Sequence, residues 1–261
     1  MQEKFKILET LTQDHLLHLF KRDYIVIRIP NFYHPNHCST IAQGLLQEID
    51  PSSGSGIYLS NIDSFWAASR DSDRQRRYFE RGSVLQDHLR QISSPFPSPI
   101  DLLCQTLCQC WSMGAKPMSM LDMPAPFGIS RLWPEGSEGL PHQDLLNREL
   151  KDHNPAIHLK SQIGVNIFLT NSHQGGELEI WDKVIKDSEY EQFSDTAKGS
   201  YGYKRDILPK ESITITPKVG DLILINTACI HAIRKVVAGQ RLTISGFVGK
   251  IGDEHPLIFW S

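Results

Sequence analysis

The chain has 261 residues, of which 40% are hydrophobic and 22% are charged, and its formal net charge is −3. This composition is that of an ordinary globular protein with enough apolar residues for one large core. It carries no basic stripe, which argues against nucleic acid as a partner. No stretch approaches the roughly 20 apolar residues of a membrane span, and the N-terminal residues do not have the pattern of a signal peptide.

The first half of the chain predicts mainly helices. A short β-branched stretch, Tyr24 to Ile29, predicts one strand followed by a turn. Apolar residues recur at helical spacing in four segments, and Asn36 is the expected N-cap of the second. These segments are residues 12–23, 36–49, 72–92 and 99–112.

Three of the five cysteines lie close together in the last of these helices, at Cys104, Cys108 and Cys110. Such a cluster can bind zinc, but no second Cys or His cluster follows nearby to complete the site. We therefore expect buried free thiols on an apolar helix face. Free thiols fit a reducing, cytoplasmic location.

The second half changes to short β runs separated by Gly- and Pro-rich turns, which predicts a sandwich or barrel. We expect one catalytic domain over 1–261, with a mostly helical part at 1–125 and a β core at 126–250. A polar stretch, 183–203, is expected to be a loop or lid insertion. The clearest strands are predicted at 127–133, 161–170, 177–182, 211–216, 221–226 and 241–249.

His142 and Asp144 are two positions apart, and on an extended strand such residues point to the same face. A third ligand could come from His231, which follows the strongest apolar run of the chain and is expected at the end of a buried strand. A hydrogen-bonded core histidine is the alternative for His231. Two imidazoles and one carboxylate on one metal would leave three coordination positions open, as in non-haem Fe(II) oxygenases.

A second feature, Arg241-x-Thr243, favours that metal site over a core histidine. On a strand, both side chains share one face, while the intervening residues form an apolar face. A buried guanidinium needs an anion, and a planar fork beside a hydroxyl suits a carboxylate. The pair is therefore expected to hold a dicarboxylate co-substrate whose other end chelates the metal.

With these residues the chain resembles the Fe(II)/2-oxoglutarate-dependent oxygenases. Within them it is similar to a branch that holds N-acyl amino-acid hydroxylases and hapalindole-type alkaloid halogenases. The resemblance begins near Ile129 and runs to the C-terminus. Its motifs are HQD at 142–144, His231, RLT at 241–243, and the stretches SRLWPEGSEGLPH, GGELEIWD, VGDLILIN and GFVGKIGDEHPLIFWS.

The resemblance implies an α+β fold, mainly β, with a double-stranded β-helix (jelly-roll) core flanked by N-terminal helices. It implies Fe(II), 2-oxoglutarate and O2 as cofactor and co-substrates, with Arg241 and Thr243 binding 2-oxoglutarate. Arg131 is expected at the other end of that molecule or in a surface ion pair. The halogenases carry Gly where this chain has Asp144, so hydroxylation is expected, with release of succinate and CO2.

The resemblance favours a small metabolite as the substrate, either an alkaloid, for example a guanidinium alkaloid toxin, or a free or N-substituted amino acid. A non-catalytic, cupin-like metal-binding protein is the alternative from another class, and the oligomeric state is not predicted. Each expected pocket residue has a structural alternative: Trp133 and Phe168 could be core residues, and Tyr203 could hold a loop in place. The expected pocket residues are Phe65, Trp66, Trp133, Asn166, Phe168 and Tyr203.

Overall fold

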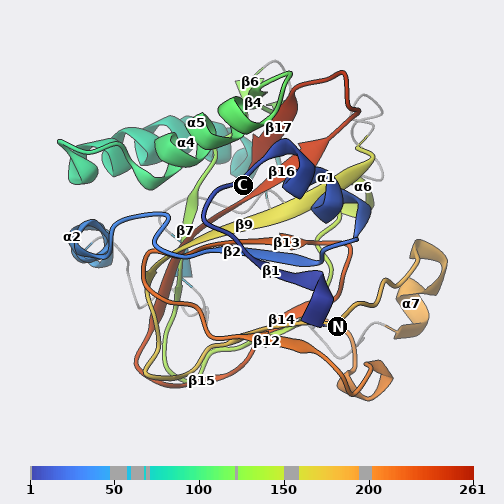
Figure 1. Cartoon of the computed structure of the whole chain (residues 1–261). Coiled ribbons are helices and arrows are strands. Elements are labelled where there is room, and N and C mark those ends of the chain that lie inside the picture. Colours follow the sequence, from blue (N-terminus) through green and yellow to red (C-terminus); the bar gives the residue numbers. More distant parts are fainter. Residues whose placement is uncertain are drawn as a thin grey trace.

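The protein is described by a computed structural model that covers residues 2–47, 58–59, 68, 71–120, 123–149, 159–193 and 202–261. Within these residues two antiparallel-rich sheets face each other, and helices from the first half of the chain cover the larger sheet (Figure 1). The arrangement confirms the double-stranded β-helix with flanking helices. No helix in the part of the chain that is described is both long and apolar enough to cross a membrane.

The first helix, α1 (Gln13–Lys21), follows from its local sequence. The Thr12 hydroxyl caps it by accepting a hydrogen bond from the backbone N–H of His15, and the helix ends at Arg22, whose φ is 67°. Its apolar face, including Leu16 and Leu19, is fully buried. It precedes strand β2 (Val26–Ile29), as the sequence predicts.

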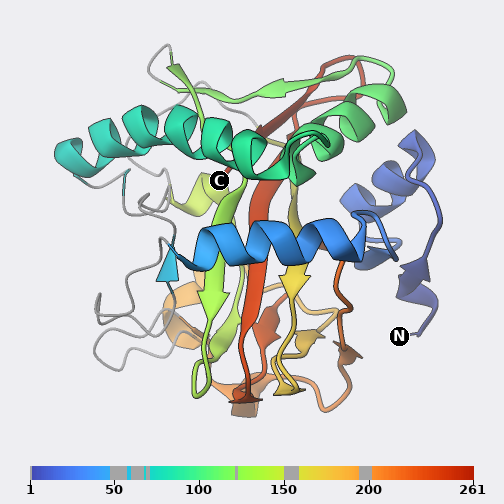
Figure 2. The same cartoon turned by 90° about the vertical axis from the view of Figure 1, so that its left-hand side faces the viewer.

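Helix α2 (Pro35–Leu46) begins one residue before the predicted cap. Asn36 is inside the helix, and His34 is the N-cap, with its side chain accepting a hydrogen bond from the Asn36 N–H at 3.3 Å. The expectation of an Asn36 cap was wrong because Pro35 occupies the first helical position, where its fixed φ is favourable and its missing N–H is not needed. Figure 2 shows α2 lying across the strands of the larger sheet.

The two long helices, α4 (Ser72–Ser93) and α5 (Pro99–Cys110), match the predicted segments within two residues. The expectation of three buried thiols on α5 was wrong in part. Cys108 is exposed, and Cys104 and Cys110 are partly buried; all three are free. Burial raises the pKa of the Cys104 thiol to about 12 and that of Cys110 to about 11, so both are protonated at neutral pH.

The larger sheet has nine strands among the described residues. Its main path runs β1 (Phe5–Ile7), β2, β13 (Leu222–Asn226), β9 (Ser161–Thr170), β16 (Arg241–Lys250), β17 (Leu257–Trp260) and β4 (Ala115–Pro117), with β7 (Ile129–Trp133) also on β16 and β3 (Tyr58–Leu59) on β7. Because β2 pairs antiparallel with β13, the N-terminal part extends the β core as well as covering it.

The smaller sheet has four strands in the described part of the chain, in the order β12 (Ile213–Ile215), β11 (Leu178–Ile180), β14 (His231–Ile233) and β8 (Gly139–His142). Two short pairs complete the strands, β10 (Gln174–Gly175) with β15 (Val236–Ala238) and β5 (Ser119–Met120) with β6 (Met123–Pro124). The remaining short helices are η1 (Gln2–Lys4), α6 (Leu146–Glu149), η3 (Asp187–Glu189), α7 (Tyr190–Phe193) and η4 (Arg205–Ile207).

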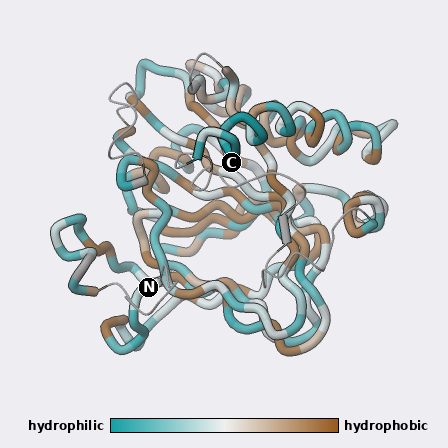
Figure 3. The backbone as a smooth tube through the Cα atoms, turned by 180° about the vertical axis from the view of Figure 1, so that it is seen from behind, coloured by the Kyte–Doolittle hydropathy of each residue, from teal (hydrophilic) through white to brown (hydrophobic). Residues whose placement is uncertain are grey.

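The core has two apolar layers, one on each face of the larger sheet. Alternate residues of β9, such as Val165 and Ile167, pack against the helices, whereas Phe168 packs between the sheets with Ile180 and Ile223. This is the period-2 alternation expected of a strand that is buried on both faces. Figure 3 shows hydrophobic residues concentrated on the strands through the middle of the molecule.

Gly220, in the turn before β13, gives a test of this packing. Its φ is +87°, and an added Cβ would lie 2.2 Å from the Tyr33 carbonyl oxygen. We expect Gly220→Ala to lower the free energy of unfolding by about 2–4 kcal/mol. The alanine would have a strained positive φ, and the backbone near Tyr33 would also have to move to make room for the Cβ. Gly114→Ala is the matched control, since its φ is +70° but nothing lies within 4 Å. It should cost about 1 kcal/mol in urea unfolding, and equal losses would contradict the packing argument.

Candidate metal centre

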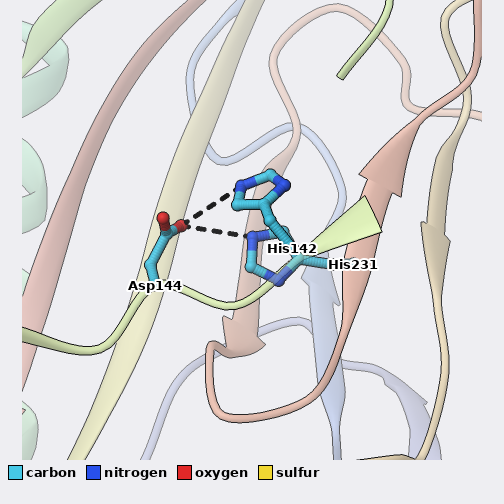
Figure 4. A group of neighbouring side chains, drawn as sticks. All are labelled: His142, Asp144 and His231. Carbon is cyan, nitrogen blue, oxygen red and sulfur yellow. Dashed lines mark hydrogen bonds and ion pairs between the residues drawn. The ribbon is translucent and has the colours of Figure 1, made fainter. Parts of the chain in front are cut away.

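His142, Asp144 and His231 converge on one point at the edge of the smaller sheet (Figure 4). Their ligand atoms all lie within 4.8 Å of one another, and they form the one such group of three among the described residues. Asp144 Oδ2 is 3.2 Å from His231 Nε2 and 3.7 Å from His142 Nε2. Two donors at about 2.1 Å from one ion and at right angles to each other lie about 3 Å apart, so this donor set suits a divalent ion.

The strands position these three groups differently from the sequence expectation. His142 is the last residue of β8, and Asp144 lies in the loop beyond it, so the two do not share a strand face. His231 is the first residue of β14, not the end of the preceding apolar strand. Strands β8 and β14 pair antiparallel with His142 opposite His231, and this register brings the two imidazoles to a centroid distance of 4.3 Å.

Backbone carbonyls orient both imidazoles. His142 Nδ1 is 2.6 Å from the Leu140 oxygen, and His231 Nδ1 is 3.1 Å from the Cys229 oxygen. A carbonyl oxygen only accepts a hydrogen bond, so each Nδ1 carries a proton and each Nε2 faces Asp144. As a metal ligand each Nε2 would give up any proton it carries and offer its lone pair, with the Nδ1–H bond fixing the ring.

The Asp144 carboxylate is held in its charged form. Burial by itself raises its pKa, but the two histidines outweigh burial through charge and hydrogen bonds, and the pKa of Asp144 lies well below its usual range. In return, Asp144 outweighs the effect of burial on His142, whose pKa is raised. Gln162 holds the loop by donating to the Asp144 carbonyl at 3.1 Å and accepting from the Leu146 N–H at 3.0 Å.

Arg241 lies on the inner face of β16 with only 2% of its surface exposed. Its Nη1 donates to the Gly176 carbonyl at 2.9 Å, and the guanidinium lies 4.7 Å from the centre of the Phe168 ring. Its buried Nε has no hydrogen-bond partner in the part of the chain that is described. Burial and then the charge of Arg131 lower the pKa of Arg241 to about 9, which is the effect of a buried cation that lacks an anion.

Thr243 and Arg131 lie beside that guanidinium. Thr243 is 1% exposed and is two residues along the same strand face from Arg241. Arg131, on β7, pairs directly with Thr243 across the strands, and its charge acts on both Arg241 and His142. The three residues that the sequence assigns to a dicarboxylate are therefore close together.

Four of the residues predicted to contact a substrate can be placed. Asn166 is on the inner face of β9, where its Oδ1 accepts from Ser245 at 2.8 Å, and Phe168 is completely buried under the Arg241 guanidinium. Trp133 packs with Ile233 of β14 and Val236 of β15, and Tyr203 donates its hydroxyl to Gln143. Their substrate contacts remain predictions. Phe65 and Trp66 lie outside the described residues.

Several polar residues of the site were not identified from the sequence. Gln143, Gln162 and Arg148 hold the loop of Asp144 through contacts with distant parts of the chain. The sequence offered one indication of a role for Gln143, which is its position between two candidate ligands. It offered no indication for Gln162 or Arg148, because their partners are set only by the tertiary fold.

A comparison with protein families matches residues 143–261 to the family described as carrier-protein-independent halogenase WelO5. Among curated proteins, an L-isoleucine 3(1)-dioxygenase of Pantoea ananatis is 26% identical over 125 residues, which are 47% of this chain and 42% of that protein. An L-gamma-glutamyl-L-propargylglycine hydroxylase of Streptantibioticus cattleyicolor is 25% identical over 167 residues, which are 63% of this chain and 59% of that protein. The matched stretches thus span about half the length of these relatives.

The fold is shared over nearly the whole chain with a solved structure. An N-substituted L-amino acid dioxygenase from Burkholderia ambifaria, solved in complex with alpha-KG, superposes with a TM-score of 0.62 at 14% identity. The likeness covers 95% of this chain and 90% of that one. At this identity it supports the jelly-roll fold alone.

Metal binding tests the centre directly. We expect the purified, metal-stripped protein to bind Mn(II), and Asp144→Asn to weaken that binding on the order of a hundredfold or more, since even residues that only support ligands cost 10–100-fold. Asp182→Asn is the matched control, because Asp182 pairs with Lys4 and Arg22 and not with the centre. Replacing the three α5 cysteines should also leave the affinity unchanged. Equal affinity of wild type and Asp144→Asn would remove Asp144 from the ligand set.

Proposed function

We propose that this chain, whose fold and C-terminal half match the Fe(II)/2-oxoglutarate-dependent oxygenase superfamily, is a dioxygenase that hydroxylates an unactivated C–H bond of a small metabolite. Succinate and CO2 are the other products. The observation that carries the proposal is the pairing of a two-His, one-Asp cluster with a buried guanidinium that has no anionic partner in the described part of the chain.

Each half of this arrangement has a role in the proposal. His142, Asp144 and His231 hold Fe(II) through two imidazole nitrogens and one carboxylate oxygen, which leaves three positions for co-substrates. When bound, the iron and 2-oxoglutarate supply the oxidation of the C–H bond by O2. The protein orients the reactants and excludes water from the space between the sheets.

Arg241 binds the distal carboxylate of 2-oxoglutarate in this proposal. Its planar guanidinium suits a carboxylate, and the Phe168 ring beneath it fixes its orientation. Thr243 adds a hydroxyl on the same face, which is hydrogen-bonded to Ser245 at 3.2 Å. The charge of Arg131 acts on both His142 and Arg241, so Arg131 is the candidate for the carboxylate end near the metal.

Hydroxylation is proposed over halogenation because of Asp144. The carboxylate lies against both histidines and so takes up a metal position that a halide would need. The matched halogenase family therefore supplies the fold of this half of the chain, and the ligand set decides the reaction.

For the substrate, the printed names of the relatives favour a free or N-substituted amino acid over an alkaloid. Three of them act on isoleucine, a γ-glutamyl dipeptide or an N-substituted L-amino acid by their names. Arg131 would also suit a substrate carboxylate. An alkaloid, including a guanidinium alkaloid toxin, remains the second candidate through the halogenase family match.

A cupin-like protein that binds metal without turnover is the alternative from another class. It would explain the three ligands but not the cost of burying Arg241 with an Nε that has no partner among the described residues. Succinate formation from 2-oxoglutarate with Fe(II) and O2 separates the two. Incubation with a library of amino acids, N-acyl amino acids and alkaloids, followed by mass spectrometry for a gain of one oxygen, identifies the substrate.

Arg241→Ala tests the co-substrate site. Removing one partner of a buried ion pair costs about 3–5 kcal/mol, so the 2-oxoglutarate concentration required should rise on the order of a hundred- to a thousandfold. The KM for the prime substrate should change much less. The measurement is succinate release as a function of 2-oxoglutarate concentration, made in parallel on the wild type, Arg241→Ala and Arg131→Ala. If only the Arg131 variant shows the rise, the distal carboxylate binds to Arg131 instead.

A further inference from the structure

We propose that Gln143 is a positioning residue that fixes the two halves of the metal centre relative to each other, and that Arg148 and Tyr203 hold it in place. The inference rests on the proposed metal site. Gln143 is not itself a ligand, although it lies between His142 and Asp144 in the sequence. Its role follows from where its amide group reaches.

The Gln143 amide uses both its donor and its acceptor. Nε2 donates to the Ala228 carbonyl at 2.6 Å, a residue 85 positions away along the chain. Oε1 accepts from the Tyr203 hydroxyl and from Arg148 Nη1, the latter at 3.3 Å. An amide held at both ends has one orientation, so the backbone between the two ligands is held as well.

The contact with Ala228 crosses from one half of the centre to the other. Ala228 is three residues before His231 and lies in the turn that leads into β14. That turn is fixed in its own right, because the Ala228 N–H donates to Asn226 Oδ1 at 3.1 Å and Asn226 Nδ2 donates to the Leu19 carbonyl at 2.8 Å. Gln143 therefore joins the loop of His142 and Asp144 to a rigid part of the core.

Arg148 connects the same amide to the polar insertion that follows β11. Its Nη1 donates to the Tyr203 hydroxyl at 2.9 Å, and its Nη2 donates to the Ile185 carbonyl at 3.1 Å. Its Nε donates to Asp187 at 2.8 Å, and its guanidinium lies 4.6 Å from the centre of the Tyr190 ring. All three nitrogens of the fork are used, so a lysine could not reproduce these contacts.

A spacer role alone would not require an amide at position 143. An apolar residue would leave the Ala228 carbonyl and the Tyr203 hydroxyl without this partner, and a carboxylate would place a second negative charge next to Asp144 while losing the donor to Ala228. The amide meets both demands without adding charge. This is why we assign the positioning role to the Gln143 side chain and not only to the backbone.

The test compares Mn(II) affinity, measured by the loss of the free-ion EPR signal, for wild type and for Gln143→Leu. Loss of a supporting residue of this kind is expected to lower the metal affinity by about 10–100-fold. The decrease should be about the same for Mn(II) and Co(II). Gln143→Asn, an amide too short to span both contacts, should weaken binding to a similar degree. Thermal unfolding of the metal-free proteins shows whether each variant is folded.

Tyr203→Phe provides a second variant that keeps the ring and removes only the hydroxyl bound to Gln143. Tyr190→Phe is its matched control, because the Tyr190 ring contacts Tyr203 and Arg148 but its hydroxyl has no part in the contacts with Gln143. We expect weaker Mn(II) binding for Tyr203→Phe, by several-fold, and wild-type binding for Tyr190→Phe. If Gln143→Leu does not fold, this pair decides the question.

The outcomes separate this inference from the proposed function. Wild-type affinity in folded Gln143→Leu and Tyr203→Phe overturns the positioning role and leaves the metal site intact. Equal weakening in Tyr203→Phe and Tyr190→Phe also overturns it, because the effect would then be that of the aromatic packing. If the wild-type protein binds neither Mn(II) nor Co(II), the proposed metal site itself is wrong.

Discussion

The antiparallel pairing of β8 with β14 is the constraint on which the candidate site depends. It places His142 opposite His231, although the two are 89 positions apart in the sequence, and the loop after β8 then brings Asp144 to both. Because side chains alternate between the two faces of a sheet, a shift of this register by one residue would turn one imidazole away from the other. The metal centre is therefore a direct consequence of strand register.

Buried charge explains why the site needs ligands from outside the chain. Asp144 stays ionised because the histidines outweigh its loss of hydration, whereas Arg241 has no such compensation within the described residues. A folded protein rarely buries a cation without an anion. The imbalance at Arg241 and the three coordination positions that the His-Asp-His group would leave on a metal together favour a dicarboxylate that reaches from one to the other.

The polar contacts around the ligand loop show how side chains from distant parts of the chain can hold an irregular segment in place. Gln162 fixes the Asp144 backbone, and Gln143 connects the same loop to the turn before His231. The long side chain of Arg148 then links this loop to residues 185–190. Catalytic geometry in such a site depends on amides and guanidiniums that are not ligands, because the loop has no sheet hydrogen bonds of its own.

Much of this protein can be predicted from its sequence. Period-2 alternation gives strands β9 and β16 and puts Arg241 and Thr243 on one face, and that pair together with His142, Asp144 and His231 suggests a metal site. The sequence also predicts helices α4 and α5 within two residues, since these features depend on local periodicity. Only the tertiary structure decided that Asp144 lies beyond its strand, that His231 begins one, that Cys108 is exposed, and that Gln143 reaches Ala228. These features depend on contacts between residues far apart in the chain, and local pattern carries no information about which distant groups will meet.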